Sequence, residues 1–283
     1  MANVGVVLAG GFAKGAYQIG ALKAIGEFFE NNQITCISAS SIGALNAYAF
    51  IAHKMDFAEK MWMNHDIKGF SSFIAKYLRG SYFVDVINKL VEESDVVKSC
   101  LYVTCFNLTK IKLNYINLQN VYKDDVREYL RASVTMPMFT HGVDISGIKY
   151  VDGGLVDNIP VRPLTKHQID YAIVIHFDNN NYMFENDCFD SKLIKINFLD
   201  EKVIKNSLAF DKDSISYMLS TGYERSMSLL DMIFKNGIDD LEYIYNKIES
   251  TNNLYGDKKS RLTGDVIIGN INKVVKKFIS CRM

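Results

Sequence analysis

The chain opens with two apolar segments, each followed by a turn of small residues and then by a helical pattern. Residues 4–9 are almost entirely apolar, which is typical of a strand buried on both faces of a parallel sheet. Residues 16–30 carry apolar side chains at helical spacing. A second apolar run at 34–39 leads into an apolar helix at 44–52. This order of strand, helix, strand and helix predicts right-handed crossovers and a parallel sheet with helices on both sides.

The same patterns continue along the rest of the chain. The three prolines all fall between Pro137 and Pro163, so this stretch is expected to be the richest in loops. We expect a three-layer α/β/α sandwich with a mainly parallel central sheet, as one domain over residues 1–283 with a helical C-terminal part from about 207 to 283. Further strands are expected at 101–106, 112–117, 148–151, 171–177 and 193–198, and further helices at 57–64, 70–78, 84–93, 124–133, 215–235 and 241–248.

Composition narrows the class of protein. Hydrophobic residues make up 48% and charged residues 23% of the chain, which is typical of a protein with a substantial core. The 32 basic and 32 acidic residues cancel, so no bulk field attracts nucleic acid, and we expect no such partner. The five cysteines show no metal or disulfide pattern and favour reduced thiols in a cytoplasmic protein. No apolar run is long enough to cross a bilayer, so any contact with membranes is expected to be peripheral.

Ser41 is the first candidate for chemistry. It lies between a buried strand and a helix, in a turn that needs small residues two places before and after a nucleophilic serine. Ala39 and Gly43 meet that size requirement. The amides at the start of the following helix can stabilise negative charge near the serine. On its own the pattern also fits a simple helix N-cap.

The glycine-rich turn after the first strand is the second candidate. Glycines let several backbone amides point at one place, which suits either a phosphate or an oxyanion. A Walker loop is disfavoured because Gly15 is followed by Ala16 and Tyr17, and a dinucleotide site because the second strand ends in serines. Because adjacent parallel strands bring their turns to one edge, an oxyanion hole facing Ser41 fits better. The residues of this predicted hole are Gly10, Gly11, Phe12 and Ala13, with Lys14 and Gly15 supporting the loop.

Asp152 is the third candidate. It ends a short predicted strand, and Gly153 and Gly154 allow the chain to fold closely around it. Alone, an Asp-Gly-Gly sequence indicates no more than a hairpin turn. In this chain the Asp-Gly-Gly sequence comes after both the glycine-rich turn and Ser41.

These three motifs together resemble the patatin-like phospholipase family, which has a glycine-rich oxyanion loop, a G-x-S-x-G serine and a later Asp-Gly-Gly or Asp-Gly-Ala. The flanking sequences agree at 16–22, at 43–47 and from Arg131 to Pro137, so the resemblance covers about residues 3 to 163. Two positions depart from the family pattern. Phe12 replaces the third loop glycine and Ala39 the first elbow glycine. If Phe12 adopts positive φ, its Cβ costs about 1 kcal/mol or more.

The resemblance implies a lipid acyl hydrolase of phospholipase A or lysophospholipase type. In that scheme Asp152 takes the proton of Ser41, an acyl-enzyme forms, and no metal, cofactor or histidine is required. A lipid or phospholipid ester is the implied substrate. Lys14 either shapes the loop or meets a phosphate head group, and a solvated lysine is an equal alternative.

Three other functions stay open at this stage. A patatin-fold protein with little turnover would bind lipid or phosphate through the same turns, and a short-chain esterase would share every motif. A Ser-His-Asp hydrolase fits poorly, because Ser41 comes early in the chain and no histidine lies in a recognisable turn. The aromatic and apolar stretch at 55–84 predicts core packing, with a cap over an acyl pocket or a lipid-facing surface as the alternative.

Overall fold

The structure is a computed structural model of the chain. It describes residues 2–30, 32–63, 81–95, 99–137, 140–178, 181–198, 210–257 and 259–261. The helix expected at 70–78 lies outside these residues, as does most of the apolar stretch at 55–84.

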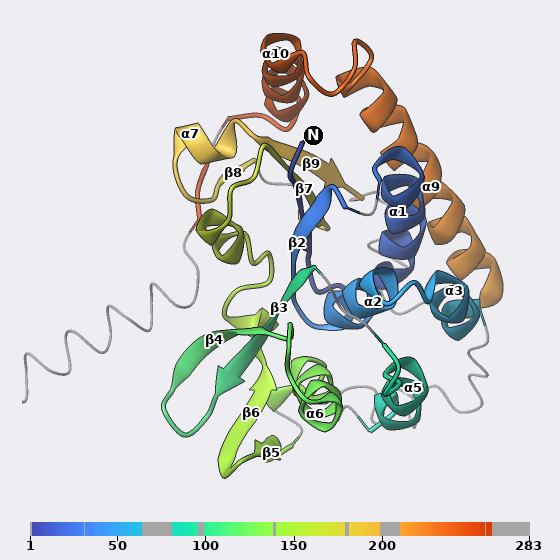
Figure 1. The fold of residues 1–283 in the computed structure, drawn as a ribbon, viewed down its shortest axis with the longest axis vertical. Coiled ribbons are helices and arrows are strands. Elements are labelled where there is room, and N and C mark those ends of the chain that lie inside the picture. Colours follow the sequence, from blue (N-terminus) through green and yellow to red (C-terminus); the bar gives the residue numbers. More distant parts are fainter. Residues whose placement is uncertain are drawn as a thin grey trace, which may run out of the picture.

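The centre of the fold is an eight-stranded mixed sheet in which seven strands follow the order β5-β6-β3-β2-β1-β7-β9 and β4 pairs with β3 (Figure 1). The five strands β3, β2, β1, β7 and β9 run parallel, and β4, β5 and β6 are antiparallel to their neighbours. The predicted α/β sandwich with a mainly parallel sheet is therefore confirmed. The strand bounds are β1 Val4–Leu8, β2 Ile34–Ala39, β3 Cys100–Asn107, β4 Lys112–Asn117, β5 Val143–Ile145, β6 Ile148–Asp152, β7 Tyr171–His176 and β9 Leu193–Asn197.

Helices flank this sheet, and α1 and α9 lie side by side along one face (Figure 1). Two glycines let these helices approach closely, because a Cβ on Gly20 would stand 2.0 Å from the carbonyl oxygen of Leu219, and one on Gly222 would stand 2.2 Å from that of Tyr17. The helix bounds are α1 Gly15–Phe28, α2 Ile42–Ile51, α3 Met55–Met63, α5 Phe83–Leu90, α6 Lys123–Ser133, α9 Lys212–Ile233 and α10 Leu241–Asn253.

The short 3₁₀ helix η4 (Arg162–Lys166) and Ile169 after it pack against β1. Leu164 packs so closely on β1 that a Cβ on Gly5 would lie 2.5 Å from its Cδ2 atom. The apolar run of β1 thus reflects burial on both faces, as the sequence pattern indicates.

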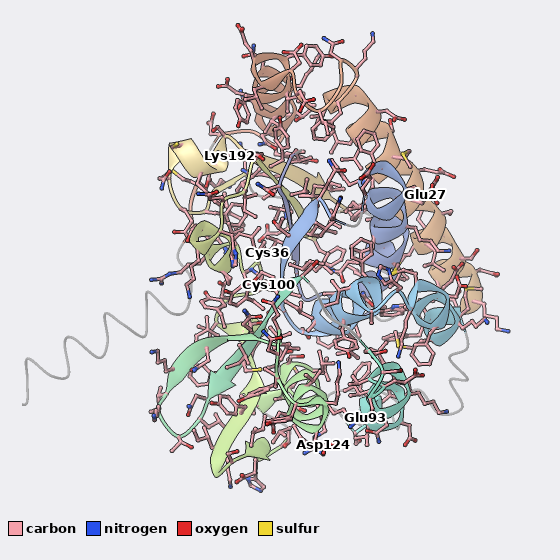
Figure 2. All side chains as sticks on the ribbon, viewed as in Figure 1. Glu27, Cys36, Glu93, Cys100, Asp124 and Lys192 are labelled. Atoms are coloured by element: carbon pink, nitrogen blue, oxygen red, sulfur yellow. The ribbon has the colours of Figure 1, made fainter. Side chains whose placement is uncertain are left out.

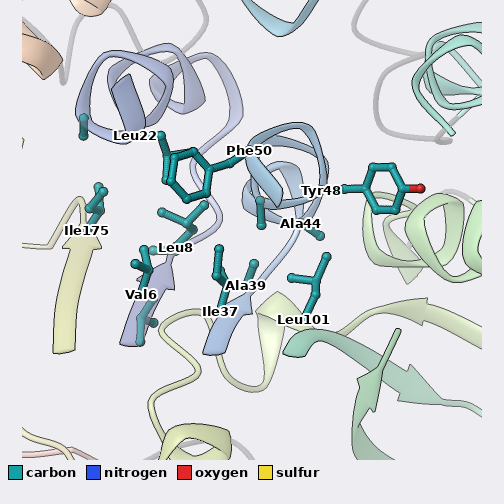
Figure 3. Close-up of a cluster of buried hydrophobic side chains, with 14 of the residues drawn as sticks. Val6, Leu8, Leu22, Ile37, Ala39, Ala44, Tyr48, Phe50, Leu101 and Ile175 are labelled. Atoms are coloured by element: carbon teal, nitrogen blue, oxygen red, sulfur yellow. The ribbon is translucent and has the colours of Figure 1, made fainter. Parts of the chain in front are cut away.

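The core between the sheet and the first helices fixes the ends of β1 and β2. Side chains of these strands, including Leu8 and Ile37, point toward Leu22 of α1 and Ala44 and Phe50 of α2 (Figure 3). Because each strand turns directly into its helix, this packing holds both strand-to-helix turns at the same edge of the sheet.

The structure adds short elements that the sequence pattern does not show. They include β5, the two-residue strands β8 (Tyr182–Met183) and β10 (Lys259–Ser260), which pair with each other, and α7 (Asp187–Asp190). Cys36 and Cys100 are opposite each other on β2 and β3, and both are free thiols (Figure 2). None of the helices in the described part of the chain combines the length and the apolar character needed to cross a membrane.

Candidate active site

The turns after β1 and β2 lie next to each other at the carboxyl edge of the sheet. The last residues of the two strands, Leu8 and Ala39, are paired in register. Two residues further on, the turns approach so closely that a Cβ on Gly10 would lie 2.8 Å from the Cβ of Ser41. Parallel pairing of β1 and β2 thus places the glycine loop beside Ser41.

Ser41 has a strained backbone, and its side chain does not cap the helix that follows it. Its φ is 54° and its ψ −132°, in the region that favours glycine. It occupies the N-cap position of α2, yet its side chain makes no capping hydrogen bond. The simple N-cap interpretation therefore does not describe its hydroxyl, which hydrogen-bonds to Asp152 instead.

Asp152 reaches Ser41 because β2 and β6 share one edge of β3. Along that edge β2 pairs with β3 up to Ala39, opposite Val103, and β6 begins to pair two residues later, where Asp152 lies opposite Cys105. Because β4 occupies the other edge of β3, the end of β6 follows the end of β2. The two candidate catalytic residues thus meet where one strand ends and the other arrives.

Burial sets the acidity of Asp152. Only 3% of the residue is exposed, and this burial raises the pKa of its carboxyl from 3.8 to about 7. Hydrogen bonds from the Ser41 side chain and from the Gly154 amide, at 2.7 Å to Oδ1, act in the opposite direction and lower the pKa. A carboxylate with a pKa near neutrality is suited to accept and return a proton.

Asn158 holds the glycine loop in place. Its amide side chain accepts from the Gly10 N–H through Oδ1 and donates through Nδ2 to the Gly10 carbonyl, both at 3.0 Å. The Gly10 amide, expected to line the oxyanion hole, is thus already bonded to Asn158. Asn158 stands six residues after Asp152, and none of the sequence motifs assigns it a role.

A network of buried polar side chains also holds the glycine loop in place. Gln18 of α1 donates to the carbonyl of Ala9 at 2.6 Å, and Asn46 of α2 donates to Gln18 and to the carbonyl of Gly15, both at 2.9 Å. Trp62 of α3 donates its indole N–H to Asn46 at 3.2 Å. Because buried amides need all their partners, this network fixes the loop relative to α1, α2 and α3.

The rest of the glycine loop forms one turn of 3₁₀ helix, η1 (Phe12–Lys14), before α1 begins at Gly15. Phe12 has a φ of 52°, so the condition for strain at this position is met. Gly11 lies against the ring of Phe177, where a Cβ would stand 2.4 Å from the ring edge. The Lys14 ammonium lies 5.4 Å from the centre of the same ring, and burial lowers the pKa of that ammonium while the charge of Asp178 raises it.

Close packing explains why the residues around Ser41 and Asp152 are small. A Cβ on Gly43 would lie 2.9 Å from the carbonyl oxygen of Leu8, so α2 can start beside β1 only with glycine there. Ala39 is fully buried at the end of β2. Gly153 lies over the backbone of β3, where a Cβ would be 2.9 Å from the carbonyl carbon of Thr104, and Gly154 donates its amide to Asp152.

A second buried carboxylate, Asp157, anchors the loop that carries Asn158. It accepts a hydrogen bond from the Tyr115 hydroxyl at 2.6 Å and pairs with Arg261 at 2.8 Å. Arg261 also donates to the carbonyl of Ile159 at 2.7 Å. The sequence did not predict this ion pair, because Arg261 lies more than 100 residues after Asp157 and belongs to no local pattern.

The described histidines have other surroundings. The His167 ring is bonded to the Tyr102 hydroxyl at 3.1 Å, and His176 lies buried in β7, where burial lowers its pKa to about 4. In a serine-histidine-aspartate triad an imidazole stands between serine and acid, whereas here Ser41 bonds to Asp152 directly.

A serine between a strand and a helix, a neighbouring glycine loop and a buried aspartate thus lie together at one edge of the α/β sandwich. The family model described as patatin-like phospholipase matches residues 6–165, more than half of the chain. The chain therefore belongs to the patatin-like phospholipase family.

Individual relatives are more distant. The Escherichia coli (strain K12) protein YjjU, described as uncharacterized, is 27% identical over 191 residues, which cover 61% of this chain and 51% of YjjU. The chain thus spans about half the length of this curated relative. Among solved structures, VipD from Legionella pneumophila has a TM-score of 0.47 at 14% identity, covering 82% of this chain and 67% of VipD. Human GIVD cytosolic phospholipase A2 in complex with methyl gamma-linolenyl fluorophosphonate has a TM-score of 0.49 at 9% identity. The match covers 89% of this chain and 60% of the phospholipase chain.

Proposed function

We propose that this protein is a lipid acyl hydrolase that uses Ser41 as nucleophile and Asp152 as general base. The observation that carries the proposal is the hydrogen bond between Ser41 and a buried Asp152 beside the glycine loop. Membership of the patatin-like phospholipase family supports a lipid ester as substrate.

The proposed reaction proceeds in two steps. Asp152 accepts the hydroxyl proton as Ser41 Oγ attacks the ester carbonyl carbon. The carbonyl oxygen becomes an oxyanion, which we assign to the amides of Gly11 and Phe12, because the Gly10 amide already bonds to Asn158. The C–O bond to the alcohol then breaks, and the leaving oxygen takes the proton from Asp152.

The second step reverses these roles with water. Asp152, ionised again, takes a proton from a water molecule that attacks the acyl-enzyme, and Ser41 leaves with that proton as the fatty acid is released. The protein supplies the proton acceptor, the oxyanion site and the orientation. All three come from residues at one edge of the sheet.

Phospholipase A or lysophospholipase activity is the subtype we propose, with Lys14 near a phosphate head group. The ammonium of Lys14 lies at the loop beside the site and partly buried against Phe177, a position from which it can approach a phosphate. A short-chain esterase shares the same reacting groups and differs only in the pocket. We also propose that the chain acts as one domain, since α9 packs directly on α1, the helix that follows the glycine loop.

Labelling with a lipid-like fluorophosphonate, followed by peptide mass mapping, tests the proposal. We expect one label per chain, on Ser41, and a large loss of labelling rate in Asp152→Asn. Asp144→Asn, which changes an exposed aspartate on β5, is the matched control and should label normally.

Two outcomes would reject the mechanism. Labelling of another serine, or equal labelling rates in Asp152→Asn and the native protein, would show that the pair does not act as nucleophile and base. A protein that takes no label but retains phospholipid binding would favour the alternative of a binding module. Hydrolysis of short-chain esters with no activity on phospholipids would favour the esterase.

A further inference from the structure

The β3–β4 hairpin projects beyond the active-site edge of the sheet. Asp152 lies opposite Cys105 on β3, and the strand continues to Asn107 before the chain turns back at Lys112. Leu108 is three residues past Cys105, so at about 3.4 Å per residue the tip lies roughly 10 Å beyond the level of Asp152. In Figure 1 this hairpin points away from the end of the molecule that carries α10.

The tip exposes apolar side chains at a conformational cost. Ile111 is 59% exposed and has a φ of 47°, a conformation in which a β-branched residue is strained and glycine or asparagine is normal. The turn itself is closed by a bond from the Lys110 amide to the Asn107 side chain at 2.8 Å, which needs nothing from Ile111. Leu108, three residues earlier in the same turn, is also exposed.

A further exposed apolar residue lies beside the base of the hairpin. Leu155, in the turn that follows Asp152, is 57% exposed. That turn packs on the hairpin, since a Cβ on Gly153 would lie 2.9 Å from a methyl carbon of Leu113 in β4. Leu155 therefore lies beside the hairpin, and Leu108 and Ile111 lie in the turn at its tip.

Three exposed lysines lie in and beside the hairpin turn. The segment from Asn107 to Asn114 carries Lys110 and Lys112, both exposed, and no acidic residue. Lys149 of β6 is exposed next to Leu108, whose amide donates to the Lys149 carbonyl at 2.9 Å. Asp144 lies opposite Lys149 across the β5–β6 pair, and its carboxylate accepts the Gly147 amide at 2.9 Å.

We propose that the tip of the β3–β4 hairpin, with Leu155, is the surface by which this protein rests on an anionic lipid bilayer. Exposed apolar side chains beside Lys110, Lys112 and Lys149 match the chemistry of such an interface, where acyl chains lie beneath negative head groups. The contact is peripheral. Only the purpose of this contact rests on the proposed function. The contact itself is independent of it, because vesicle binding can be measured without turnover.

The test measures co-sedimentation of the Ser41→Ala protein with vesicles of phosphatidylcholine and phosphatidylglycerol at roughly two to one, an anionic surface. Ile111→Asn should weaken partitioning by roughly tenfold through lost apolar burial. It should also raise the melting temperature, because asparagine tolerates the left-handed conformation. Lower binding together with higher stability excludes misfolding as the cause.

A second pair of variants tests the charges. Lys110→Glu with Lys112→Glu should weaken binding at least about fivefold per lysine, and the loss should shrink as salt is added or phosphatidylglycerol is left out. The matched controls are Leu254→Asp, at an exposed apolar position after α10, and the pair Lys212→Glu with Lys235→Glu on and after α9. These controls should bind as the parent does.

Unchanged binding of Ile111→Asn, or equal losses in the controls, would overturn the proposed surface. The same variants in the active Ser41 background distinguish this failure from failure of the proposed function. If the surface is right, they hydrolyse a monomeric water-soluble ester normally and act slowly on vesicles. A protein that binds vesicles through the hairpin yet hydrolyses no ester would leave the surface standing and reject the enzyme.

Discussion

Replacing Asp152 with asparagine should change the dependence of stability on pH as well as activity. The buried carboxyl has a pKa of about 7 in the folded protein and near 3.8 in the unfolded chain. Between these values the folded protein binds the proton and the unfolded chain has lost it. The free energy of unfolding therefore falls as pH rises through this window and levels off above about pH 7.

The size of this change follows from the two pKa values. A tenfold change in an ionisation constant corresponds to about 1.4 kcal/mol, so a pKa that moves from 3.8 to about 7 corresponds to about 4 kcal/mol. Asparagine does not titrate, and any effect of its amide on the bonds to Ser41 and Gly154 is independent of pH. Relative to the native protein, Asp152→Asn should gain up to about 4 kcal/mol between about pH 4 and pH 7.

Urea unfolding followed by circular dichroism across this pH range measures that difference. Asp144→Asn, at an exposed position, should show no comparable trend. A difference between Asp152→Asn and the native protein that stays constant with pH would refute the argument that burial raises this pKa. The same ionisation predicts that kcat/KM of the native protein rises about tenfold per pH unit below about pH 7 and is constant above it.

Three further predictions concern the loop and the helix packing. Phe12→Gly should raise the free energy of unfolding by about 1 kcal/mol through relief of strain, measured by urea unfolding, and a decrease would show that the ring contributes more packing than strain costs. Asn158→Ala should lower kcat by about ten- to a hundredfold through a displaced Gly10 loop, with a smaller effect on KM, in steady-state assays on a soluble ester. An unchanged kcat would remove Asn158 from the site. Gly222→Ala should lower the melting temperature and cost about 1–3 kcal/mol, because its Cβ would lie 2.2 Å from the Tyr17 carbonyl oxygen, whereas an equal melting temperature would mean that α1 and α9 separate freely.

The sequence predicted the parts of the fold that depend on local periodicity. The apolar runs at 4–9 and 34–39 became β1 and β2, and the long helical patterns became α1 and α9. The three-residue strand β5 is too short to show a period of two. No local pattern could reveal that β6 pairs with the same edge of β3 as β2 does, because pairing between distant strands depends on the whole sheet.

In the candidate site, too, local patterns predict some residues and leave out those whose partners lie far along the chain. Ser41 could be predicted because Ala39 and Gly43 flank it, and Asp152 because two glycines follow it. Asn158 could have been noticed, since a polar residue six places after Asp152 stands in the same loop, but its partner Gly10 lies 148 residues earlier. The bond between them exists only because two loops meet at one edge of the sheet. The contact of Arg261 with Asp157 also joins distant parts of the chain and has no local pattern.

Backbone strain connects the site to its sequence. Phe12 and Ser41 both have positive φ, and each lies in one of the two turns that form the site. Such conformations persist only where the surroundings fix them, and here the Gln18 and Asn46 network and the Asn158 bonds hold the glycine loop from both sides. A glycine in place of Phe12 would not need that support, whereas phenylalanine holds the positive φ at an energetic cost. The strain therefore favours a role for the Phe12 side chain, which we propose is to shape the space for the acyl chain of the substrate.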